Sequence, residues 1–442
     1  NSWLDVAYGG KLQKHLLENA HILAIYESAL ERQFTSAAIN TIISFLRKGR
    51  SADSAETRFI RLLDVFEKSV TDPSRQRIIV KTRAELWQEG SDESGRYVGN
   101  KWGGKYLRAP DIFFTILEKG KGKLVPLGKI AEVRFGIKTG ANEFFYLEPV
   151  EMSVKDVVEL QDIAPTTPVR VRNDAGWEGE IEAGWLQPVI KSPREIRTLM
   201  VRLEDLSHLI FMPPKEVREG IRAHSRKPLQ QYPNALAYIR WGEQQGYHQR
   251  PTCRSRNPWW DVGEQDIPPI VLNKGVNDRH FVTINSHAFC DQQIYECFTN
   301  SPNAQLIAAC LNWSGAGIFW EQLGRRNFGE GVLWIAVYEA SKMLVPSPFA
   351  LSVCQSCNLL SAFRRLCERP VRSIFEELGF ELCRERRCDH PEHPYEHVTP
   401  EALTLERVRR ASSDRFELDA VIFDVLGLTN EERLAVYKSV AQ

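Results

Sequence analysis

The fold is decided by two short apolar runs around a glycine-containing turn, Ile130-Ala-Glu-Val-Arg-Phe-Gly-Ile-Lys-Thr-Gly-Ala-Asn-Glu-Phe-Phe-Tyr-Leu147. The run 130–137 has the composition of a β-strand, and 144–147 is a second apolar run. Between them lies Lys138-Thr-Gly-Ala-Asn142, where Gly140 permits a tight turn. This arrangement predicts that a mixed α/β unit begins near Lys123.

Upstream of this stretch, the pattern predicts a helix followed by two strands. Residues 10–19 place three leucines at helical spacing beneath a polar face. Residues 21–27 and 39–46 are short, apolar and β-branched, as expected of strands in an α/β sheet. Such a unit is too small to stand alone, so we expect the rest of its domain to precede residue 1.

Downstream, residues 182–345 predict mixed short strands and helices, including an alternating strand at 280–285. From residue 352 onward the pattern is mostly helical. The polar, small-residue segments 49–58 and 89–104 are expected to be loops.

Composition indicates a globular chain of two or three domains. The 442 residues are 43% hydrophobic and contain no apolar run of membrane-spanning length, about 18 residues. Nine cysteines, an odd number and all at or beyond Cys253, do not form a disulfide framework, which favours a reducing cytoplasm. Lys+Arg and Asp+Glu both total 57, so net charge does not identify a polyanionic partner.

The distribution of charge is more informative than the total. Basic residues outnumber acids between 215 and 256, which can mark a nucleic-acid footprint, although most such runs are solvated faces. Guanidinium groups can donate two hydrogen bonds to guanine, and neighbouring aromatic rings can support them. The alternative is a tryptophan-filled core with arginines at its edge. The basic residues are Lys215, Arg218, Arg222, Arg226, Lys227, Arg240, Arg250, Arg254 and Arg256.

The C-terminal cysteines and histidines do not follow the spacing of a zinc ribbon. Cys354-Gln-Ser-Cys357 is one close pair, and the gaps that follow it are irregular. Cys367 lies in a helical pattern, where a thiol fills apolar space. We therefore predict no metal site. If zinc were bound, the expected ligands would be Cys383, Cys388, His390 and His393.

Four stretches, taken together and in this order, resemble the TaqI-like family of adenine-N6 DNA methyltransferases, which includes fused restriction-modification enzymes. They cover nearly the whole chain. They are Asn1-Ser-Trp-Leu-Asp-Val-Ala-Tyr-Gly9 with Glu31-Arg-Gln-Phe34 and Asn40-Thr41; Trp102-Gly103 with Tyr106-Leu-Arg-Ala-Pro110; Phe135 to Phe145; and Arg250-Pro251, Arg254 to Trp260, Leu311-Asn312 and Arg325 to Gly331.

The resemblance implies that the catalytic centre lies outside this chain. The family binds S-adenosylmethionine through a glycine-containing strand-to-helix turn and carries an Asn/Asp-Pro-Pro-aromatic tetrapeptide, and neither occurs here in a matching position. Asn257-Pro-Trp-Trp260 lacks the second proline and comes after the segments that should follow the tetrapeptide. Both motifs are expected upstream. The chain alone is then expected to be inactive, and S-adenosylmethionine to serve the intact enzyme.

The predicted fold class is α/β: the C-terminal fragment of a class I methyltransferase sheet, a mixed α/β target-recognition domain and a helical tail. The expected divisions are the end of the catalytic domain at 1–50, a connecting segment at 51–120, the recognition domain at 121–350 and the helical segment at 351–442.

The resemblance also implies site residues. Phe34 occupies the position of an aromatic residue that stacks on the flipped adenine, although it could instead cap the sheet core. Loop groups around Gly140 suit phosphate oxygens, although a plain turn is the alternative. The second glycine-flexible loop, 325–331, is expected on the DNA backbone. The candidate DNA contacts are Lys138, Thr139, Gly140, Asn142, Arg250, Arg254, Arg256, Lys274, Arg325, Arg326 and Asn327.

The expected partner is double-stranded DNA, with no membrane, in the cytoplasm. Two alternatives stay open. The chain could be one half of a split methyltransferase whose other chain binds the cofactor. It could also be a non-catalytic DNA-specificity subunit.

Overall fold

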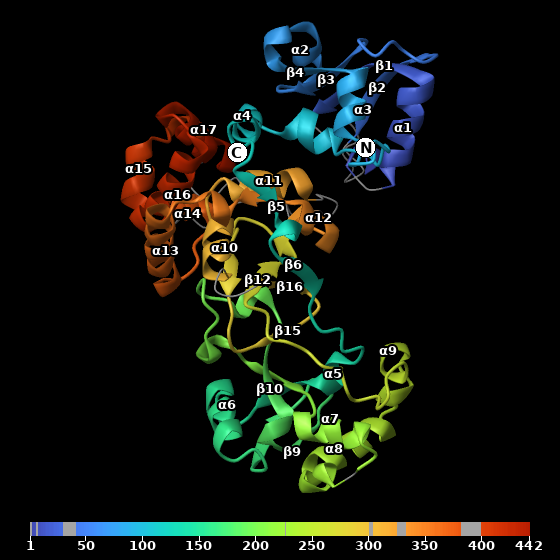
Figure 1. Cartoon of the computed structure of the whole chain (residues 1–442), viewed down its shortest axis with the longest axis vertical. Coiled ribbons are helices and arrows are strands. Elements are labelled where there is room, and N and C mark those ends of the chain that lie inside the picture. Colours follow the sequence, from blue (N-terminus) through green and yellow to red (C-terminus); the bar gives the residue numbers. More distant parts are fainter. Residues whose placement is uncertain are drawn as a thin grey trace.

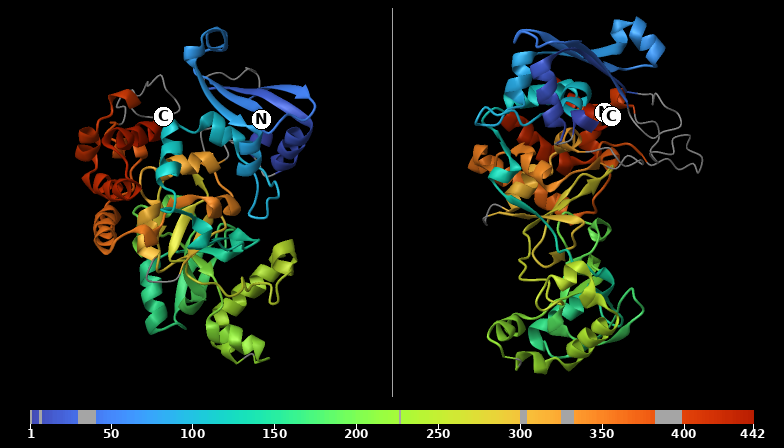
Figure 2. Two further views of the ribbon diagram at one scale, coloured as in Figure 1. Left: turned by 45° about the horizontal axis from the view of Figure 1, so that its top comes forward. Right: turned by 90° about the vertical axis from the view of Figure 1, so that its right-hand side faces the viewer.

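The computed structural model describes residues 2–5, 8–29, 41–225, 227–299, 304–324, 333–381 and 399–442. The molecule is elongated, with an N-terminal sheet at one end, a lower lobe at the other, and a central sheet between them (Figure 1). The helical C-terminal part packs beside the central sheet (Figures 1 and 2). The predicted α/β fold class is confirmed by this mixture of several sheets and many helices.

The N-terminal sheet has four strands in the order β2-β1-β3-β4. The predicted helix and both predicted strands are present, but the sheet extends beyond residue 50, because two further strands join it. Only the β1–β3 pair is parallel. Its elements are α1 (Gly9–Asn19), β1 (Ala20–Ser28), β2 (Ile42–Lys48), β3 (Glu56–Leu62), α2 (Phe66–Thr71), β4 (Gln76–Thr82) and α3 (Arg83–Glu89).

One face of this sheet is packed and the other is not. Ile25 and Phe59 are fully buried together with Trp102 and Tyr106. Trp102 directly precedes the helical turn Gly103–Arg108, and Tyr106 lies within it. On the edge strands, Phe45, Ile78 and Val80 are exposed. Since Phe45 is paired with Ala24, and Ile78 with Ile60, these exposed side chains belong to the face that carries a second, smaller cluster.

Two further sheets form the rest of the α/β part. The central sheet has the order β14-β12-β16-β6, and the lower lobe contains a six-stranded sheet, β15-β10-β11-β7-β8-β9. Two short strand pairs, β13 with β17 and β18 with β5, complete it. The strands are β5 (Leu124–Pro126), β6 (Glu132–Phe135), β7 (Tyr146–Pro149), β8 (Pro168–Arg172), β9 (Glu178–Glu182), β10 (Leu186–Ile190), β11 (His208–Phe211), β12 (Ile270–Asn273), β13 (Gly275–Val276), β14 (Val282–Ile284), β15 (Phe289–Cys290), β16 (Ile294–Phe298), β17 (Leu333–Trp334) and β18 (Leu344–Pro346).

The predicted strands at 130–137 and 280–285 are confirmed as β6 and β14, and the second apolar run, 144–147, spans a helical turn and the start of a strand. Asn142–Phe145 form a helical turn, α5, and the strand begins only at Tyr146. The N–H groups of Phe144 and Phe145 both donate to the carbonyl of Ala141. A helical turn buries both adjacent rings, whereas a strand would direct them to opposite faces.

Among the connections between the central sheet and the lower lobe, two segments lie side by side. Gly136 N–H donates to Ile294 O at 3.1 Å, and Ile137 N–H donates to Cys290 O at 2.7 Å. Gln292 N–H returns a hydrogen bond to Ile137 O at 3.1 Å. A Cβ on Gly136 would lie 2.3 Å from the carbonyl oxygen of Asp291, so only glycine fits this crossing.

The lower lobe has an aromatic core. The rings of Phe144 and Tyr238 stack with centroids 4.6 Å apart, and Trp185 stacks on Phe211 at 4.7 Å. Trp260 is buried in the same core, in agreement with the interpretation that this tryptophan is a core residue. The helices of this lobe are α6 (Val154–Ile163), α7 (Lys215–Arg222), α8 (Pro233–Gln244) and α9 (Pro251–Arg254).

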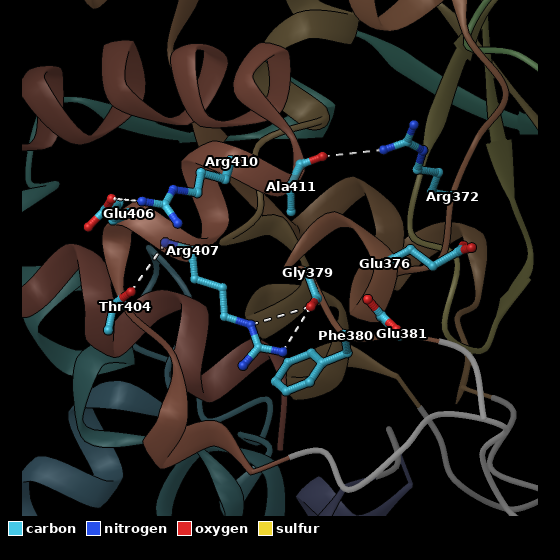
Figure 3. A pocket seen from close by; sticks show the side chains of 10 residues that line it. All are labelled: Arg372, Glu376, Gly379, Phe380, Glu381, Thr404, Glu406, Arg407, Arg410 and Ala411. Carbon is cyan, nitrogen blue, oxygen red and sulfur yellow. Dashed lines mark hydrogen bonds and ion pairs between the residues drawn. The ribbon is translucent and has the colours of Figure 1, made fainter. Parts of the chain in front are cut away.

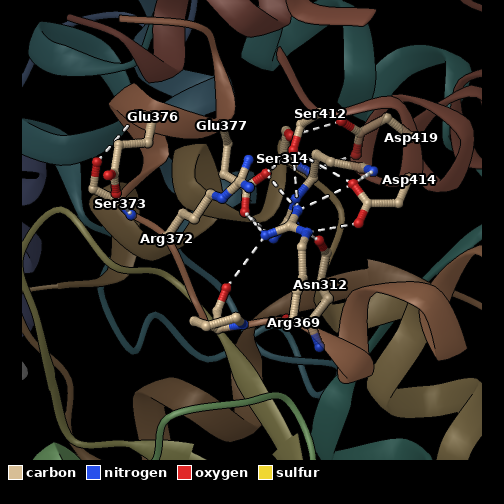
Figure 4. Close-up of polar contacts among 12 residues, drawn as sticks. Asn312, Ser314, Arg369, Arg372, Ser373, Glu376, Glu377, Ser412, Asp414 and Asp419 are labelled. Atoms are coloured by element: carbon tan, nitrogen blue, oxygen red, sulfur yellow. Dashed lines mark hydrogen bonds and ion pairs between the residues drawn. The ribbon is translucent and has the colours of Figure 1, made fainter. Parts of the chain in front are cut away.

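The C-terminal part is helical, as predicted. A buried polar network joins it to the centre (Figure 4): Arg369 donates to Glu377 at 2.8 Å and to Asp414 at 2.6 Å, and Ser314 donates to Asp419 at 2.6 Å. No described helix has the length and hydrophobicity needed to cross a bilayer. The remaining helices are α4 (Asp111–Lys119), α10 (Ala304–Leu311), α11 (Ala316–Leu323), α12 (Val337–Lys342), α13 (Val353–Glu368), α14 (Ile374–Glu377), α15 (Leu405–Ala411), α16 (Ser413–Leu426) and α17 (Asn430–Val440).

One buried carboxylate in the central sheet gives a pH-dependent prediction. Glu296 in β16 is 4% exposed, and its Oε1 accepts no hydrogen bond from the described residues. Burial raises the pKa of Glu296 to about 7, although Arg134 on the paired strand opposes this shift. A carboxylate whose pKa is higher in the folded state destabilises the fold as pH rises from its unfolded pKa through its folded pKa.

We therefore expect Glu296→Gln to stabilise the protein at alkaline pH but not at acid pH. Relative to the unchanged chain, the gain in the free energy of unfolding should be on the order of 2 to 3 kcal/mol at about pH 8 and near zero at about pH 4. Urea denaturation at both pH values measures the difference. A gain of the same size at both would show that ionisation of Glu296 plays no part.

Candidate nucleic-acid interface

The predicted phosphate-binding loop is a tight, internally bonded turn. Gly140 has a φ of +81°, the left-handed conformation that favours glycine. Thr139 is buried, and its hydroxyl donates to the Asn142 side chain and accepts from Ala141 N–H at 3.4 Å. In this structure Thr139 and Asn142 therefore stabilise the loop. Lys138 is exposed and has no side-chain partner among the described residues.

The helix α9 packs directly on this loop. Arg256, just after the helix, donates to Thr139 O at 2.8 Å and also to Lys138 O. A Cβ on Gly140 would lie 2.5 Å from the Thr252 side chain, so the close approach requires glycine. The structure thus brings together two candidate segments that are more than one hundred residues apart, 138–142 and 250–256.

The three predicted DNA-contacting arginines have different environments. Arg250 donates to Glu143 at 2.9 Å and lies over the Tyr247 ring, with 4.7 Å from guanidinium carbon to ring centroid. The hydrogen bond from Arg250 holds the pKa of Glu143 below its usual value, so the pair is ionic. Arg256 is held by backbone carbonyls. Arg254 alone of the three is exposed without a partner among the described residues.

The basic stripe from 215 to 256 is not a continuous cationic face. Arg218 is paired with Asp261 at 3.1 Å, and Arg222 is paired with Glu264 at 3.2 Å. These acids lie beyond the end of the stripe in sequence, so counting charges within it overstated the local charge. Within the described part of the stripe, the exposed cations that lack a partner are Lys227, Arg240 and Arg254.

Lys274 occupies a separate position between β12 and β13. Its ammonium lies 5.7 Å from the ring centroid of Phe135 and 5.4 Å from that of Trp334. Phe135 is the last residue of β6 and directly precedes the crossing to the loop. Lys274 thus faces aromatic rings at the end of the central sheet.

Several predicted residues lie outside the described residues, and their roles stay predictions. They are Phe34, Arg325, Arg326 and Asn327, together with the four zinc candidates Cys383, Cys388, His390 and His393.

A cavity of about 670 Å³ in the helical tail has three arginines in its lining (Figure 3). Each of them is already engaged. Arg407 donates to Gly379 O at 2.9 Å, Arg372 donates to Ala411 O at 3.4 Å, and Arg410 is paired with Glu406. Because each of these guanidinium groups already has a partner within the protein, the cavity is a weaker candidate for an anion site than the loop and α9.

The described residues do not fit S-adenosylmethionine or a metal. In the N-terminal sheet, β3 leads to α2 through Leu63-Asp64-Val65, and β4 leads directly into α3 at Thr82. Neither strand-to-helix turn contains the glycine that would let backbone N–H groups approach the cofactor. Among the described residues there is no group of three His, Cys, Asp or Glu side chains placed to hold a metal ion.

Sequence reasoning missed three residues that shape this interface: Glu143, Thr252 and Phe135. Glu143 and Phe135 lie within the stretch 130–147. There, the acidic Glu143 five residues after Lys138 indicated an ion-pair partner for a cation. Thr252 carried no such signal, because its importance arises only from its contact with Gly140.

Comparisons with known proteins support the resemblance over part of the chain. Residues 220–373 match the family model described as type II methyltransferase M.Eco57I, C-terminal domain. The match includes α9 and Lys274. It confirms, for this segment, the predicted resemblance to the C-terminal part of a restriction-modification methyltransferase.

Two solved structures are also similar. One is the type IIG restriction endonuclease BpuSI, with 14% identity over 96% of this chain and 46% of that chain, and a TM-score of 0.42. The other is the type IIL restriction-modification enzyme MmeI in complex with DNA, with 13% identity over 99% of this chain and 48% of that chain, and a TM-score of 0.45. This chain therefore spans about half the length of either structure. No curated protein matches it.

The contact between Gly140 and α9 can be tested against a matched glycine. Gly176, in the turn between β8 and β9, has a φ of +82° but nothing within 4 Å of its Cβ direction. Alanine at either position strains the backbone, but only at Gly140 does it also collide with Thr252. We expect Gly140→Ala to destabilise the protein by about 1 to 3 kcal/mol more than Gly176→Ala. Thermal unfolding compares the two, and equal losses would contradict the packing of α9 on the loop.

Proposed function

We propose that this chain is the DNA-recognition portion of a site-specific adenine-N6 DNA methyltransferase that uses S-adenosylmethionine in its intact form. The observation that carries the proposal is the joint between the 138–142 loop and α9. It presents two exposed cations that have no partner among the described residues, Lys138 and Arg254, on a support in which Arg250 and Arg256 are held by hydrogen bonds. The family match over 220–373 supports the methyltransferase context.

The two cations suit different parts of DNA. An ammonium acts as a compact point charge and positions a protein on phosphate oxygens. A guanidinium is a planar fork that can donate two hydrogen bonds to guanine O6 and N7. We assign Lys138 to the phosphate backbone and Arg254 to a base edge.

The chemical step is assigned, as the resemblance implies, to motifs outside this chain. A base inside a duplex cannot present its exocyclic amine to a methyl donor, so the target nucleotide must rotate out and stack on aromatic side chains. Phe34 is proposed for that stacking role on the family resemblance alone. The described N-terminal turns lack the glycine that the cofactor needs, so no step of methyl transfer is assigned to them.

The N-terminal sheet bears on the choice between enzyme and free-standing DNA reader. The exposed apolar side chains of Phe45, Ile78 and Val80 favour a covering protein segment, since their exposure to water is unfavourable. This supports a part of a larger or split methyltransferase over a non-catalytic specificity subunit. Mixing the chain with a cofactor-binding chain separates these, because a split enzyme would regain methylation and a pure reader would not.

If Lys138 holds a phosphate, Lys138→Ala should weaken binding to all duplexes about equally. The slope of log K against log salt should fall in magnitude by roughly 0.9, the contribution of one phosphate contact. Lys155→Ala is the control, because Lys155 is paired with Glu204 and lies on α6, at the side of the lower lobe away from α9 (Figure 1). Fluorescence anisotropy across a salt series gives both slopes. An unchanged slope for Lys138→Ala would remove this residue from the interface.

If Arg254 contacts a base, its substitution should affect only the preferred sequence. After selection of that sequence from a randomised duplex pool, Arg254→Ala should lose about 1 to 3 kcal/mol on it and little on scrambled DNA. Arg222→Ala, which removes an exposed arginine paired with Glu264, should change neither. Competition binding measures the ratio of the two affinities. If that ratio is unaltered in Arg254→Ala, base recognition lies elsewhere.

A further inference from the structure

Phe135 is an exposed aromatic residue at the end of a paired strand. It is 56% exposed, whereas Val133, two residues earlier on the same face of β6, is 7% exposed. Single exposed apolar residues are common on protein surfaces, so exposure alone carries no conclusion. The contacts around the Phe135 ring distinguish it from such single exposed residues.

The ring stands on a fixed support. Phe135 is opposite Tyr295 on β16, and the two rings meet edge to face with centroids 5.3 Å apart. Tyr295 is fully buried, and its hydroxyl donates to Ile335 O at 2.7 Å. The backbone directly after Phe135 is held by the hydrogen bond from Gly136 N–H to Ile294 O. An aromatic side chain has few rotamers to lose, so this support presents the ring in a defined direction.

One cation lies over the Phe135 ring, and another follows it closely along the chain. The Lys274 ammonium is 5.7 Å from its ring centroid. Lys138, three residues onward, is exposed and without a partner among the described residues. Two other exposed phenylalanines provide a contrast: Phe45 and Phe349 have no cation–ring contact among the described residues. A supported aromatic ring with a cation beside it and another close in the chain suits a ligand that has planar bases and a phosphate backbone.

We propose that Phe135 stacks on an unpaired base of DNA, with Lys274 and Lys138 on the adjoining phosphates. This inference rests on the proposed DNA-binding function and extends it. A stacking residue outside the cofactor-binding domain would stabilise a duplex in which one base has left the helix. Stacking on an aromatic ring tolerates every base, so Phe135 contributes to distortion of the duplex and not to sequence choice.

The test compares binding to two duplexes of one sequence, one fully paired and one with a single thymine opposite an abasic site. The second duplex has already lost one base pair, so a protein that stacks on an unpaired base should bind it more tightly. We expect the full chain to prefer the abasic duplex by roughly 5- to 150-fold, as a base–aromatic stack allows. Phe135→Leu should lose the preference, because leucine keeps an apolar contact with Tyr295 but has no aromatic face. Phe135→Trp should retain it.

Three controls make each outcome decisive. Phe349→Ala removes an exposed phenylalanine of the helical part that has no cation beside it, and should leave the preference unchanged. Lys138→Ala should weaken binding to both duplexes by the same factor. Melting temperatures of the variants identify any loss of fold. If the full chain bound neither duplex, the proposed DNA-binding function would be wrong. If it bound both and Phe135→Leu kept the full preference, DNA binding would stand and the stacking role would be overturned.

Discussion

The structure depends on a pair of hydrogen-bonded segments that pass between the central sheet and the lower lobe. Three backbone hydrogen bonds of 2.7 to 3.1 Å join Gly136-Ile137 to the neighbouring segment 290–294. The approach is so close that a Cβ on Gly136 would meet the Asp291 carbonyl at 2.3 Å. Asp291 is itself buried and accepts a hydrogen bond from the Tyr146 hydroxyl at 2.5 Å, which ties the crossing to the first strand of the lower sheet. Because these two segments are hydrogen-bonded to each other, the loop that follows Ile137 starts from a defined position.

Two of the cations around the loop are held by contacts within the protein. Arg250 and Arg256 resemble DNA contacts in sequence, yet one is bonded to Glu143 and the other to the carbonyls of Lys138 and Thr139. Hydrogen bonds that involve a charged group are stronger than neutral ones, so these arginines are well suited to positioning. They hold α9 on the loop and leave Lys138 and Arg254 exposed. A site in which few cations are free, and those few are held on a rigid base, has less conformational entropy to lose on binding.

The helical tail uses buried charge in another way. Arg369 lies between Glu377 and Asp414, and Arg415 bonds to the carbonyl of Asn312 and lies near Glu377. Buried ion pairs often add little net stability, because desolvation offsets their attraction, but removing one partner leaves an unpaired buried charge. The network therefore fixes how the tail meets the central sheet more than it strengthens the fold. The N-terminal sheet differs from the tail, because its apolar outer face lacks a cover among the described residues.

The sequence by itself determined the local elements and a family resemblance. Helical spacing gave α1 and the C-terminal helices, apolar runs gave β1, β2 and β6, and the ordered motifs gave the resemblance that the family model confirms over 220–373. These features follow from periodicity and local chemistry, which short segments carry within themselves. Only the tertiary structure decided which candidates share a surface and which charges are free. Gly140 meets Thr252, Arg218 meets Asp261 and Lys274 meets Phe135 across long separations in the chain, and no local pattern encodes such contacts. The helical turn at Phe144 had the same origin, because burial of two adjacent rings in the lower core outweighed the strand preference of their sequence.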